Sequence, residues 1–510
     1  MTDWTAGYVA DIAYTYGYYT ELNPLHMRLA FLQAGVAFPE VGTACELGFG
    51  QGVSTNLHAA ASITHWFGTD FNPAQAAYAQ ELRGAAGSDA QLFDEGFDAF
   101  CQRDDLPKFD YIALHGIWSW ISDENRAVIV DFIRRKLNVG GVLYISYNTQ
   151  PGWAAMVPLR DLLTQHSEVM SAPAQGIVTR IDSALDFANK LMSANPKFAQ
   201  ANPLVADRLT ELKGQNRNYL AHEYFNRDWL PMPFSRMAEW LSPTKLNYVC
   251  SANYIDHIDA LTLTTEQQNL LKDIAAPMFR ETVRDFCVNQ QFRRDFWVNG
   301  LRTLNPIQQA QQLRQQLVVL IQPRAEVTLK VKGGLGEASM QEAIYAPILD
   351  ALADHQAKTL GQIEQLIAGN EIQLSQLTQA IMILCGTGAV TTAQPPLTPQ
   401  RNEMAKALNL YLCRQACAGG EVAYLTSPVT GGGVPVSHIQ QMFIHAREQG
   451  AASVQQWAHH AWNALTQQGK RLLKEGKALE SDAATLAELE QQASAFAAKQ
   501  LPILQALQVL

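Results

Sequence analysis

The chain has 510 residues, well above the roughly 100 to 200 residues of one domain, so several domains with sizeable cores are expected. Its composition, 47% hydrophobic and 17% charged, is typical of a folded soluble protein and argues against a disordered or membrane chain. The net charge of −10 argues against a nucleic-acid partner and mildly favours a basic substrate.

Strand-like apolar runs alternate with helical patterns from residue 41 to 148, which is typical of βαβ units and a parallel sheet. The expected strands are 43–47, 65–70, 90–95, 110–116 and 142–148. The expected helices are 52–63, 73–84 and 122–137. Ser122 and Asp123 supply capping chemistry for the last helix. The pattern predicts a Rossmann-like α/β domain over residues 1–155.

The pattern changes after residue 155 to long segments rich in Ala, Leu and Gln. A mostly helical middle domain is expected over 156–300, ending in a stretch, 279–300, whose residues recur at helical spacing. A mostly helical C-terminal domain is expected over 301–510. Within it, 359–394 has the helix, helix, strand order of a winged-helix-like module.

The N-terminal segment, the apolar runs and the cysteines indicate which classes of protein and site are not expected. The first residues lack the basic and apolar regions of a signal peptide, and no run of 18 apolar residues occurs, so a cytoplasmic chain without membrane attachment is expected. The seven cysteines are scattered, without a CxxC pair, which argues against a disulfide framework and a zinc site. Adjacent histidines at 459 and 460 point to different helix faces, and no metal site is predicted.

The stretch ELGFGQG, residues 46–52, places three glycines between a predicted strand and a predicted helix. A helix N-terminus behind a parallel strand usually holds a nucleotide. The spacing is GxGxG, whereas a dinucleotide fold requires GxGxxG, and Glu46 would repel a pyrophosphate. The loop therefore favours a cofactor whose nearby group is cationic.

S-adenosyl-L-methionine is such a cofactor, and the stretch resembles motif I of the class I methyltransferases. Asp70 ends the next predicted strand, where a carboxylate can accept both ribose hydroxyls. The alternative is a tight strand-to-helix turn without a ligand. The residues predicted to bind the cofactor are Glu46, Gly48, Gly50, Gly52, Asp70, Phe71, Asp94, Glu95 and His115.

The sequence gives weaker support for three members of that set, Asp94, Glu95 and His115. Asp94 and Glu95 follow the third predicted strand, where this class commonly places a polar residue near the adenine, and solvated loop charge is the alternative. His115 lies at the carboxyl end of the fourth predicted strand, the edge where open α/β sheets bind ligands. It is equally compatible with an interior histidine.

Three further motifs give a closer resemblance: HGIWSWI at 115–121, LYISYNTQPGW at 143–153 and YLAHEYFN at 219–226. In that order they resemble bacterial class I methyltransferases with a methyltransferase regulatory domain, which include protein lysine methyltransferases. The resemblance implies an N-terminal lid segment over the cofactor. Here that segment departs from the family's proline-rich pattern, which favours a different substrate.

The resemblance implies an acceptor site with aromatic and polar walls. The residues expected to take part are His115, Trp118, Tyr147, Asn148, His222, Glu223 and Tyr224. Trp118 is also compatible with a core anchor, and Glu223 with a structural ion pair to Arg217 or Arg227.

The leading functional hypothesis is N-methylation of lysine side chains on a protein substrate. A cationic sulfonium near the amine lowers the amine's pKa by about three units, so a dedicated base is optional. The alternatives are a methyltransferase acting on a small molecule or glycan, and a non-catalytic sensor that uses the same fold.

Overall fold

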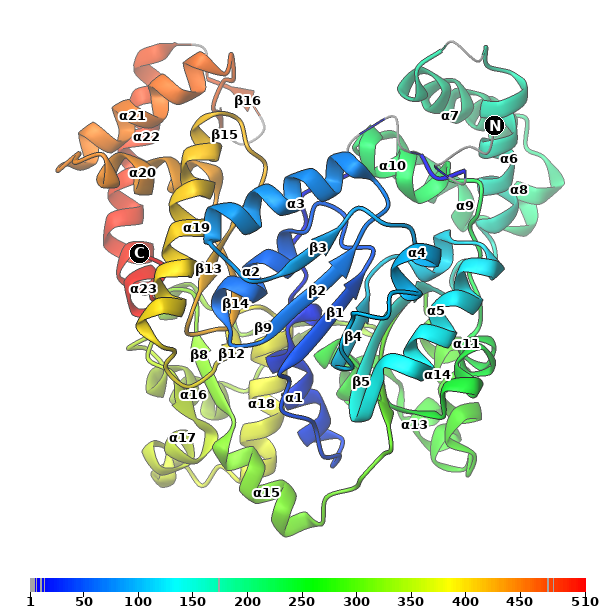
Figure 1. Cartoon of the computed structure of the whole chain (residues 1–510), viewed down its shortest axis with the longest axis horizontal. Coiled ribbons are helices and arrows are strands. Elements are labelled where there is room, and N and C mark those ends of the chain that lie inside the picture. Colours follow the sequence, from blue (N-terminus) through cyan, green and yellow to red (C-terminus); the bar gives the residue numbers. More distant parts are fainter. Residues whose placement is uncertain are drawn as a thin grey trace.

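A seven-stranded sheet is the centre of the computed structural model, which describes residues 5, 7–9, 12, 14–172, 175–474, 477–479 and 481–510 (Figure 1). Its strand order is β3-β2-β1-β4-β5-β7-β6. The strands are β1 Thr43–Leu47, β2 His65–Thr69, β3 Gln91–Phe93, β4 Phe109–Leu114, β5 Leu137–Asn148, β6 Leu246–Ser251 and β7 Phe292–Asn299. The first five pair in parallel, and β7 runs antiparallel to both β5 and β6.

The helices that connect the first five strands confirm the predicted α/β fold. They are α2 Val53–Ala61, α3 Pro73–Ala86, α4 Phe97–Cys101 and α5 Asp123–Lys136. The Ser122 side chain accepts a hydrogen bond from the backbone N–H of Asn125, as its capping chemistry predicts. The crossovers place the N-termini of these helices at the carboxyl edge of the sheet.

The prediction of helical structure across 279–300 was wrong for its second half. Helix α14, Pro277–Val288, ends at Asn289, which has a left-handed φ of 50°, and β7 follows. Strand β7 lies between two other strands, so its charged residues Arg293 and Asp295 are buried and pair with each other. A buried strand with internal charges lacks polar–apolar alternation, so tertiary pairing decides its conformation.

The chain leaves the sheet after β5 and returns to it at β6. The first helices of this excursion have a hydrophobic cluster of their own, at the upper right of Figure 1. They are α6 Val157–Val169, α7 Ile177–Ser193, α8 Lys197–Ala201, α9 Leu204–Lys213 and α10 Arg217–Tyr224. Helices α11 Phe234–Leu241, α12 Asp259–Thr262, α13 Thr265–Lys272 and α14 then flank β6 and β7. The segment predicted as a middle domain, 156–300, therefore also supplies two strands of the central sheet.

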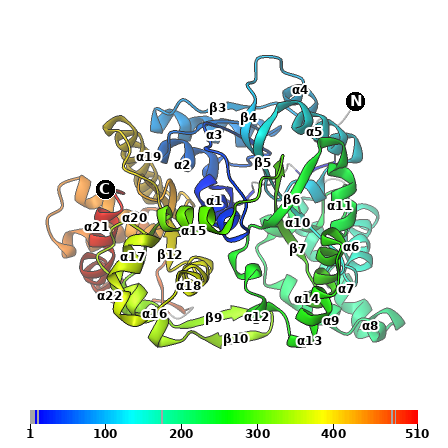
Figure 2. The ribbon, with the colours of Figure 1, turned by 90° about the horizontal axis from the view of Figure 1, so that it is seen from below.

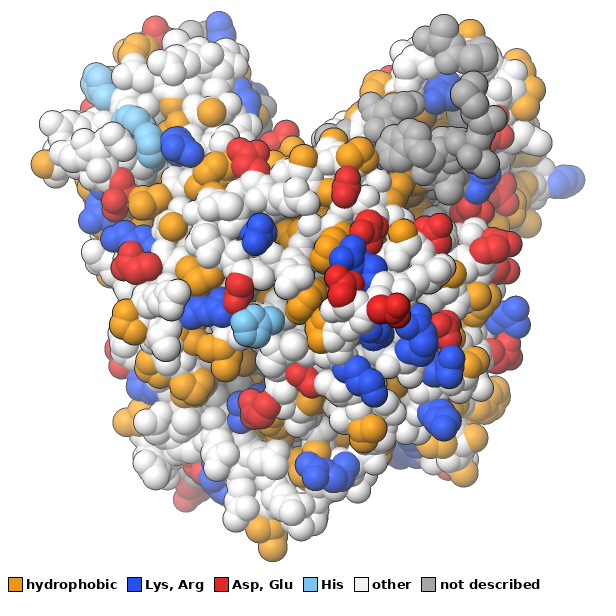
Figure 3. Space-filling model, in the orientation of Figure 1, with side chains coloured by type: hydrophobic (Ala, Val, Ile, Leu, Met, Phe, Trp, Pro, Cys, Tyr) orange, Lys and Arg blue, Asp and Glu red, His pale blue; other side chains and the backbone are white. Residues whose placement is uncertain are grey.

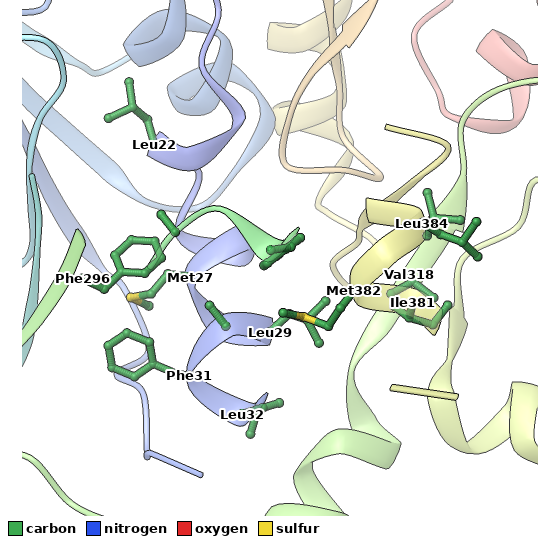
Figure 4. Close-up of a cluster of buried hydrophobic side chains, with 14 of the residues drawn as sticks. Leu22, Met27, Leu29, Phe31, Leu32, Phe296, Val318, Ile381, Met382 and Leu384 are labelled. Atoms are coloured by element: carbon green, nitrogen blue, oxygen red, sulfur yellow. The ribbon is translucent and has the colours of Figure 1, made fainter. Parts of the chain in front are cut away.

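Helix α1, Pro24–Gln33, lies near the middle of the molecule, between the sheet and the C-terminal part (Figure 2). It begins at the Asn23 cap and is apolar on most sides, as a helix buried all round must be. Figure 4 shows Phe31 on the side of Phe296 of β7, and Leu29 facing Met382 of the C-terminal part. One core thus joins the sheet to the C-terminal part.

The first half of the C-terminal part contains the predicted helix, helix, strand order. Its elements are α15 Pro306–Gln315, β8 Leu317–Leu320, β9 Lys330–Gly333, β10 Gly336–Ser339, α16 Glu342–Ala351, β11 Lys358–Thr359, α17 Leu360–Leu366, α18 Leu374–Gly386 and β12 Val390–Thr392. Strands β11, β8 and β12 form one small sheet, and β9 and β10 form a separate hairpin. The helix, helix, strand order is present, and a winged-helix-like module stays a prediction.

The second half is built on the long helix α19, Pro399–Cys417, which packs against α2 and α3 of the sheet domain (Figure 1). Arg401 pairs with Asp89, and the Tyr411 hydroxyl donates to Glu81. The remaining elements are β13 Tyr424–Ser427, β14 Gly432–Pro435, α20 His438–Glu448, α21 Val454–Gln467, β15 Leu473–Lys474, β16 Lys477–Ala478, α22 Asp482–Ala495 and α23 Leu501–Ala506. Across the described ranges, every helix is too short or too polar to cross a bilayer.

Candidate active site

A cavity with two joined chambers lies at the carboxyl ends of β1, β2 and β4. The outer chamber has a volume of about 400 Å³, and the inner one about 60 Å³. Gly48, Asp70, Gly116 and Trp120 line both chambers. The position agrees with the rule that open α/β sheets bind ligands outside the carboxyl ends of their strands.

The glycine-rich loop forms one wall of this cavity and leads into α2. Gly48, Gly50 and Gly52 all have left-handed φ angles, of 76°, 57° and 66°. A Cβ atom on Gly52 would lie 2.4 Å from the Cβ of Ala79 on α3. The loop therefore needs glycine for its turn and for the close packing of α2 on α3.

Two buried carboxylates lie beside this loop. Asp70 accepts hydrogen bonds from the backbone N–H groups of Gly50, at 2.9 Å, and Asn72, at 3.0 Å. Glu46 accepts a hydrogen bond from the Thr55 hydroxyl. Burial raises the pKa of Glu46 to about 8 and that of Asp70 to about 7. Both carboxylates therefore gain from a nearby cation.

The charged side chains that line the cavity, among the described residues, are acidic. They are Glu46, Asp70, Glu95, Asp98, Glu124, Glu223 and Asp228. Among the described residues that line it, none is Lys or Arg. The negative electrostatic potential of such a cavity repels phosphates and attracts a cationic ligand. The residues present thus fit a sulfonium cofactor and do not fit a dinucleotide.

Tyrosines from the N-terminal segment form another wall of the cavity. Tyr8 lines both chambers, and Tyr14 and Tyr19 line the inner one. The Tyr19 ring lies 3.9 Å from the His115 ring, measured between centroids. Sequence analysis missed these tyrosines, although the tyrosine-rich run at 14–19 is a signal that could have indicated an aromatic wall. The other part of the predicted lid, residues 1–4, 6, 10, 11 and 13, lies outside the described residues.

His115 lines the inner chamber, at the end of β4. Its Nδ1 forms a hydrogen bond with the Tyr144 hydroxyl at 2.8 Å. Burial lowers the pKa of His115 to about 4, so the ring is neutral at pH 7. A neutral imidazole adds no positive charge to the cavity.

Helix α10 brings His222 and Glu223 to the inner chamber from a distant part of the sequence. The Nε2–H of His222 donates to the carbonyl of Ile12 at 3.0 Å, so this ring holds the N-terminal segment. Burial raises the pKa of Glu223 to about 7. The two arginines considered as ion-pair partners of Glu223 form other pairs. Arg217 pairs with Asp182, and Arg227 pairs with Asp228.

Four residues predicted at the acceptor site lie in the core and do not line the cavity. The Trp118 indole is buried and donates to the sulfur of Met232. The other three are Tyr147, whose hydroxyl donates to Asp295, Asn148, which is buried at the end of β5, and Tyr224, which packs on Trp153. All four side chains are therefore packed in the protein interior, away from the residues that line the two chambers.

Of the remaining residues predicted to bind the cofactor, some line the cavity and one does not. Phe71 and Glu95 line the outer chamber, where Glu95 also pairs with Arg103 at 2.6 Å. Asp94 is exposed and does not line either chamber. Trp120 lines both chambers, and its indole N–H donates to the Glu223 carbonyl at 3.3 Å.

Comparison with known proteins adds three findings. The family model described as a methyltransferase regulatory domain matches residues 216–299, which run from α10 to β7. The uncharacterized protein sll1526 of Synechocystis is 39% identical over 507 residues, which cover 98% of each chain. The structure of PKMT2 from Rickettsia typhi in complex with AdoHcy superposes with a TM-score of 0.69 at 17% identity, covering 98% of this chain and 99% of that one.

The sheet order, the glycine-rich loop and its two carboxylates define a class I methyltransferase that uses S-adenosylmethionine. The chain belongs to the same family as the Synechocystis protein, with a methyltransferase regulatory domain between its cofactor domain and its C-terminal part.

Replacing Asp70 by alanine should weaken binding of S-adenosylmethionine by about 1.5 to 3 kcal/mol, the range for losing a hydrogen bond to a charged group. Isothermal calorimetry on the ligand-free protein measures this. The matched control is Asp94→Ala, an exposed carboxylate at the end of the adjacent strand, which should leave the affinity unchanged. Equal affinities for wild type and Asp70→Ala would contradict the site.

Proposed function

We propose that this methyltransferase transfers methyl groups to lysine side chains of a protein substrate. The observation that carries the proposal is the acidic, aromatic cavity, with no Lys or Arg among its described lining residues and with Glu223 in its inner chamber. Aromatic faces and carboxylates attract an ammonium group.

When bound, the cofactor supplies an electrophilic methyl group on a positively charged sulfur. The acceptor must be a neutral amine, and lysine at pH 7 is neutral in about one molecule in 2,500, a deficit of about 4.6 kcal/mol. The carboxylate of Glu223 receives the ammonium and accepts its proton, because burial places its pKa near 7. The aromatic rings of Tyr14 and Tyr19 orient the amine.

The inner chamber favours a slender acceptor. The space inside it, about 60 Å³, is far smaller than the space of about 400 Å³ in the outer chamber. A narrow chamber suits a linear aliphatic amine better than a sugar ring. This size argues for lysine over the glycan alternative.

Three further observations support a protein substrate. PKMT2, a protein lysine methyltransferase, shares the fold over nearly its whole length. Glu223 lies inside the segment that matches the methyltransferase regulatory domain. The net charge of −10 also favours a basic protein, so added salt should weaken substrate binding more than cofactor binding.

The proposal is tested by incubating the purified chain with methyl-labelled S-adenosylmethionine and a host lysate, followed by acid hydrolysis and amino-acid analysis. We expect the label in methylated lysine, and much less of it in reactions with Asp70→Ala. Label confined to small solutes or glycans would overturn the proposal in favour of the other acceptor class. An absence of transfer to every class of acceptor would favour a sensor.

A further inference from the structure

Three potential metal ligands meet in the C-terminal part, far from the active-site cavity in sequence. Cys417 is the last residue of α19, His445 lies on α20, and His460 lies on α21. Their donor atoms all lie within 4.8 Å of one another. Sequence analysis found no ligand near His460 because its two partners are 15 and 43 residues away.

The distances within this trio, Cys417, His445 and His460, match those around a tetrahedral zinc ion. The Cys417 Sγ lies 3.6 Å from His445 Nδ1 and 3.6 Å from His460 Nε2, and the two nitrogens are 3.0 Å apart. Zinc bonds of about 2.3 Å to sulfur and about 2.0 to 2.1 Å to nitrogen give separations of about 3.6 Å and about 3.3 Å at tetrahedral angles. One ion can therefore contact all three atoms with small adjustments.

Hydrogen bonds alone satisfy the three donor atoms less completely than a bound metal ion would. The thiol of Cys417 has one proton, so it can donate to only one of the two nitrogens at 3.6 Å, and the other contact must be an N–H bond to sulfur, which is a weak acceptor. A single cation, in contrast, accepts the lone pairs of all three atoms. Thiolate and imidazole are the ligand types that zinc prefers.

The surroundings allow an ion to enter. All three side chains are half-buried, and three protein ligands leave a fourth position for water. Figure 3 shows histidine side chains at the surface of the lobe that carries α20 and α21. Arg414 and Glu448 both act on His445, with opposite signs of charge, so the local field does not exclude a cation.

We propose that Cys417, His445 and His460 bind one Zn²⁺ ion that ties together α19, α20 and α21. On binding, the thiol of Cys417 releases its proton to solvent as the sulfur–zinc bond forms. The ion would fix the C-terminal end of α19, the helix that packs against α2 and α3 of the cofactor domain. The expected role is structural, because the trio lies on the helices of the C-terminal part.

The site is tested on the full chain with Co²⁺, which reports its ligands by absorption. Titration should produce a thiolate-to-cobalt charge-transfer band and the intense visible bands of a tetrahedral site, saturating at one ion per chain. Zn²⁺ should abolish both. The variants Cys417→Ala and His460→Ala should lower the affinity about 100-fold or more. The control His459→Ala, on the neighbouring position of the same helix, should bind as wild type does.

A second measurement protects the test against variants that fail to fold. Zn²⁺ should raise the melting temperature of wild type and His459→Ala by a few degrees, and leave that of His460→Ala unchanged. A wild-type chain without the charge-transfer band, or a Cys417→Ala chain that keeps wild-type affinity, would overturn the proposal. The trio would then be a hydrogen-bonded cluster only.

Discussion

Replacing Glu223 by glutamine should reduce kcat by about 100-fold or more, because the acceptor ammonium then loses the group that takes its proton. Cofactor affinity should change little, since Asp70 and the glycine loop remain. Rates with saturating cofactor and a lysine-containing substrate measure kcat, and calorimetry measures the affinity.

The stability of the same variant distinguishes a catalytic from a structural role. The pKa of Glu223 is raised to about 7 in the folded state, so this carboxyl favours the folded protein below its ordinary pKa. That contribution is lost as the pH rises through 7. The variant should therefore melt at the same or a higher temperature at pH 8. A large drop in melting temperature with normal kcat would contradict the catalytic role, and the exposed Glu239→Gln serves as control.

Replacing Arg293 by methionine should lower the free energy of unfolding by about 3 to 5 kcal/mol, the range for breaking a buried ion pair. Its guanidinium contacts Asp285 at 2.6 Å, Asp295 at 3.0 Å and Glu281 at 3.0 Å, and it is almost fully buried. Without it, three carboxylates face one another in the core. Urea unfolding measures the loss.

The pH dependence of this loss is a second check. Burial raises the pKa of Asp285 to about 7 and also raises that of Asp295, so both protonate readily once Arg293 is gone. The loss should therefore be smaller at about pH 5 than at about pH 8. The control is Arg236→Met, since the exposed pair of Arg236 with Glu239 contributes only about 0 to 1 kcal/mol. Equal losses in the two variants would contradict the account.

Local patterns were sufficient to predict the cofactor half of the fold. The five predicted strands occur within a few residues of their expected bounds, and the glycines of the 46–52 loop have the left-handed φ angles that a tight turn requires. Such features depend on neighbours in sequence, which explains why one sequence reveals them.

Long-range packing explains what the sequence could not predict. Strand β7 forms by pairing with β5 and β6. Its buried charged residues Arg293 and Asp295 interrupt the polar–apolar alternation that would have predicted a strand. Trp118 follows the cavity-lining Ile117 in sequence, and Tyr147 lies near the carboxyl end of β5, but both side chains are buried in the core. The zinc ligands and the tyrosine wall come together only through the tertiary fold.

The most direct test of the central claim is the calorimetric affinity for S-adenosylmethionine between about pH 6 and about pH 8. The pKa of Glu46 is raised to about 8 and that of Asp70 to about 7, so both must lose protons before they act as anions, Glu46 toward the cationic end of the cofactor and Asp70 as the acceptor of the ribose hydroxyls. The account predicts that Kd falls as the pH rises, by up to about tenfold per unit for each proton released, and that the Asp70→Ala variant shows a shallower slope. A Kd that does not change across this range, or that rises with pH, would contradict an acidic cavity built for a cationic cofactor.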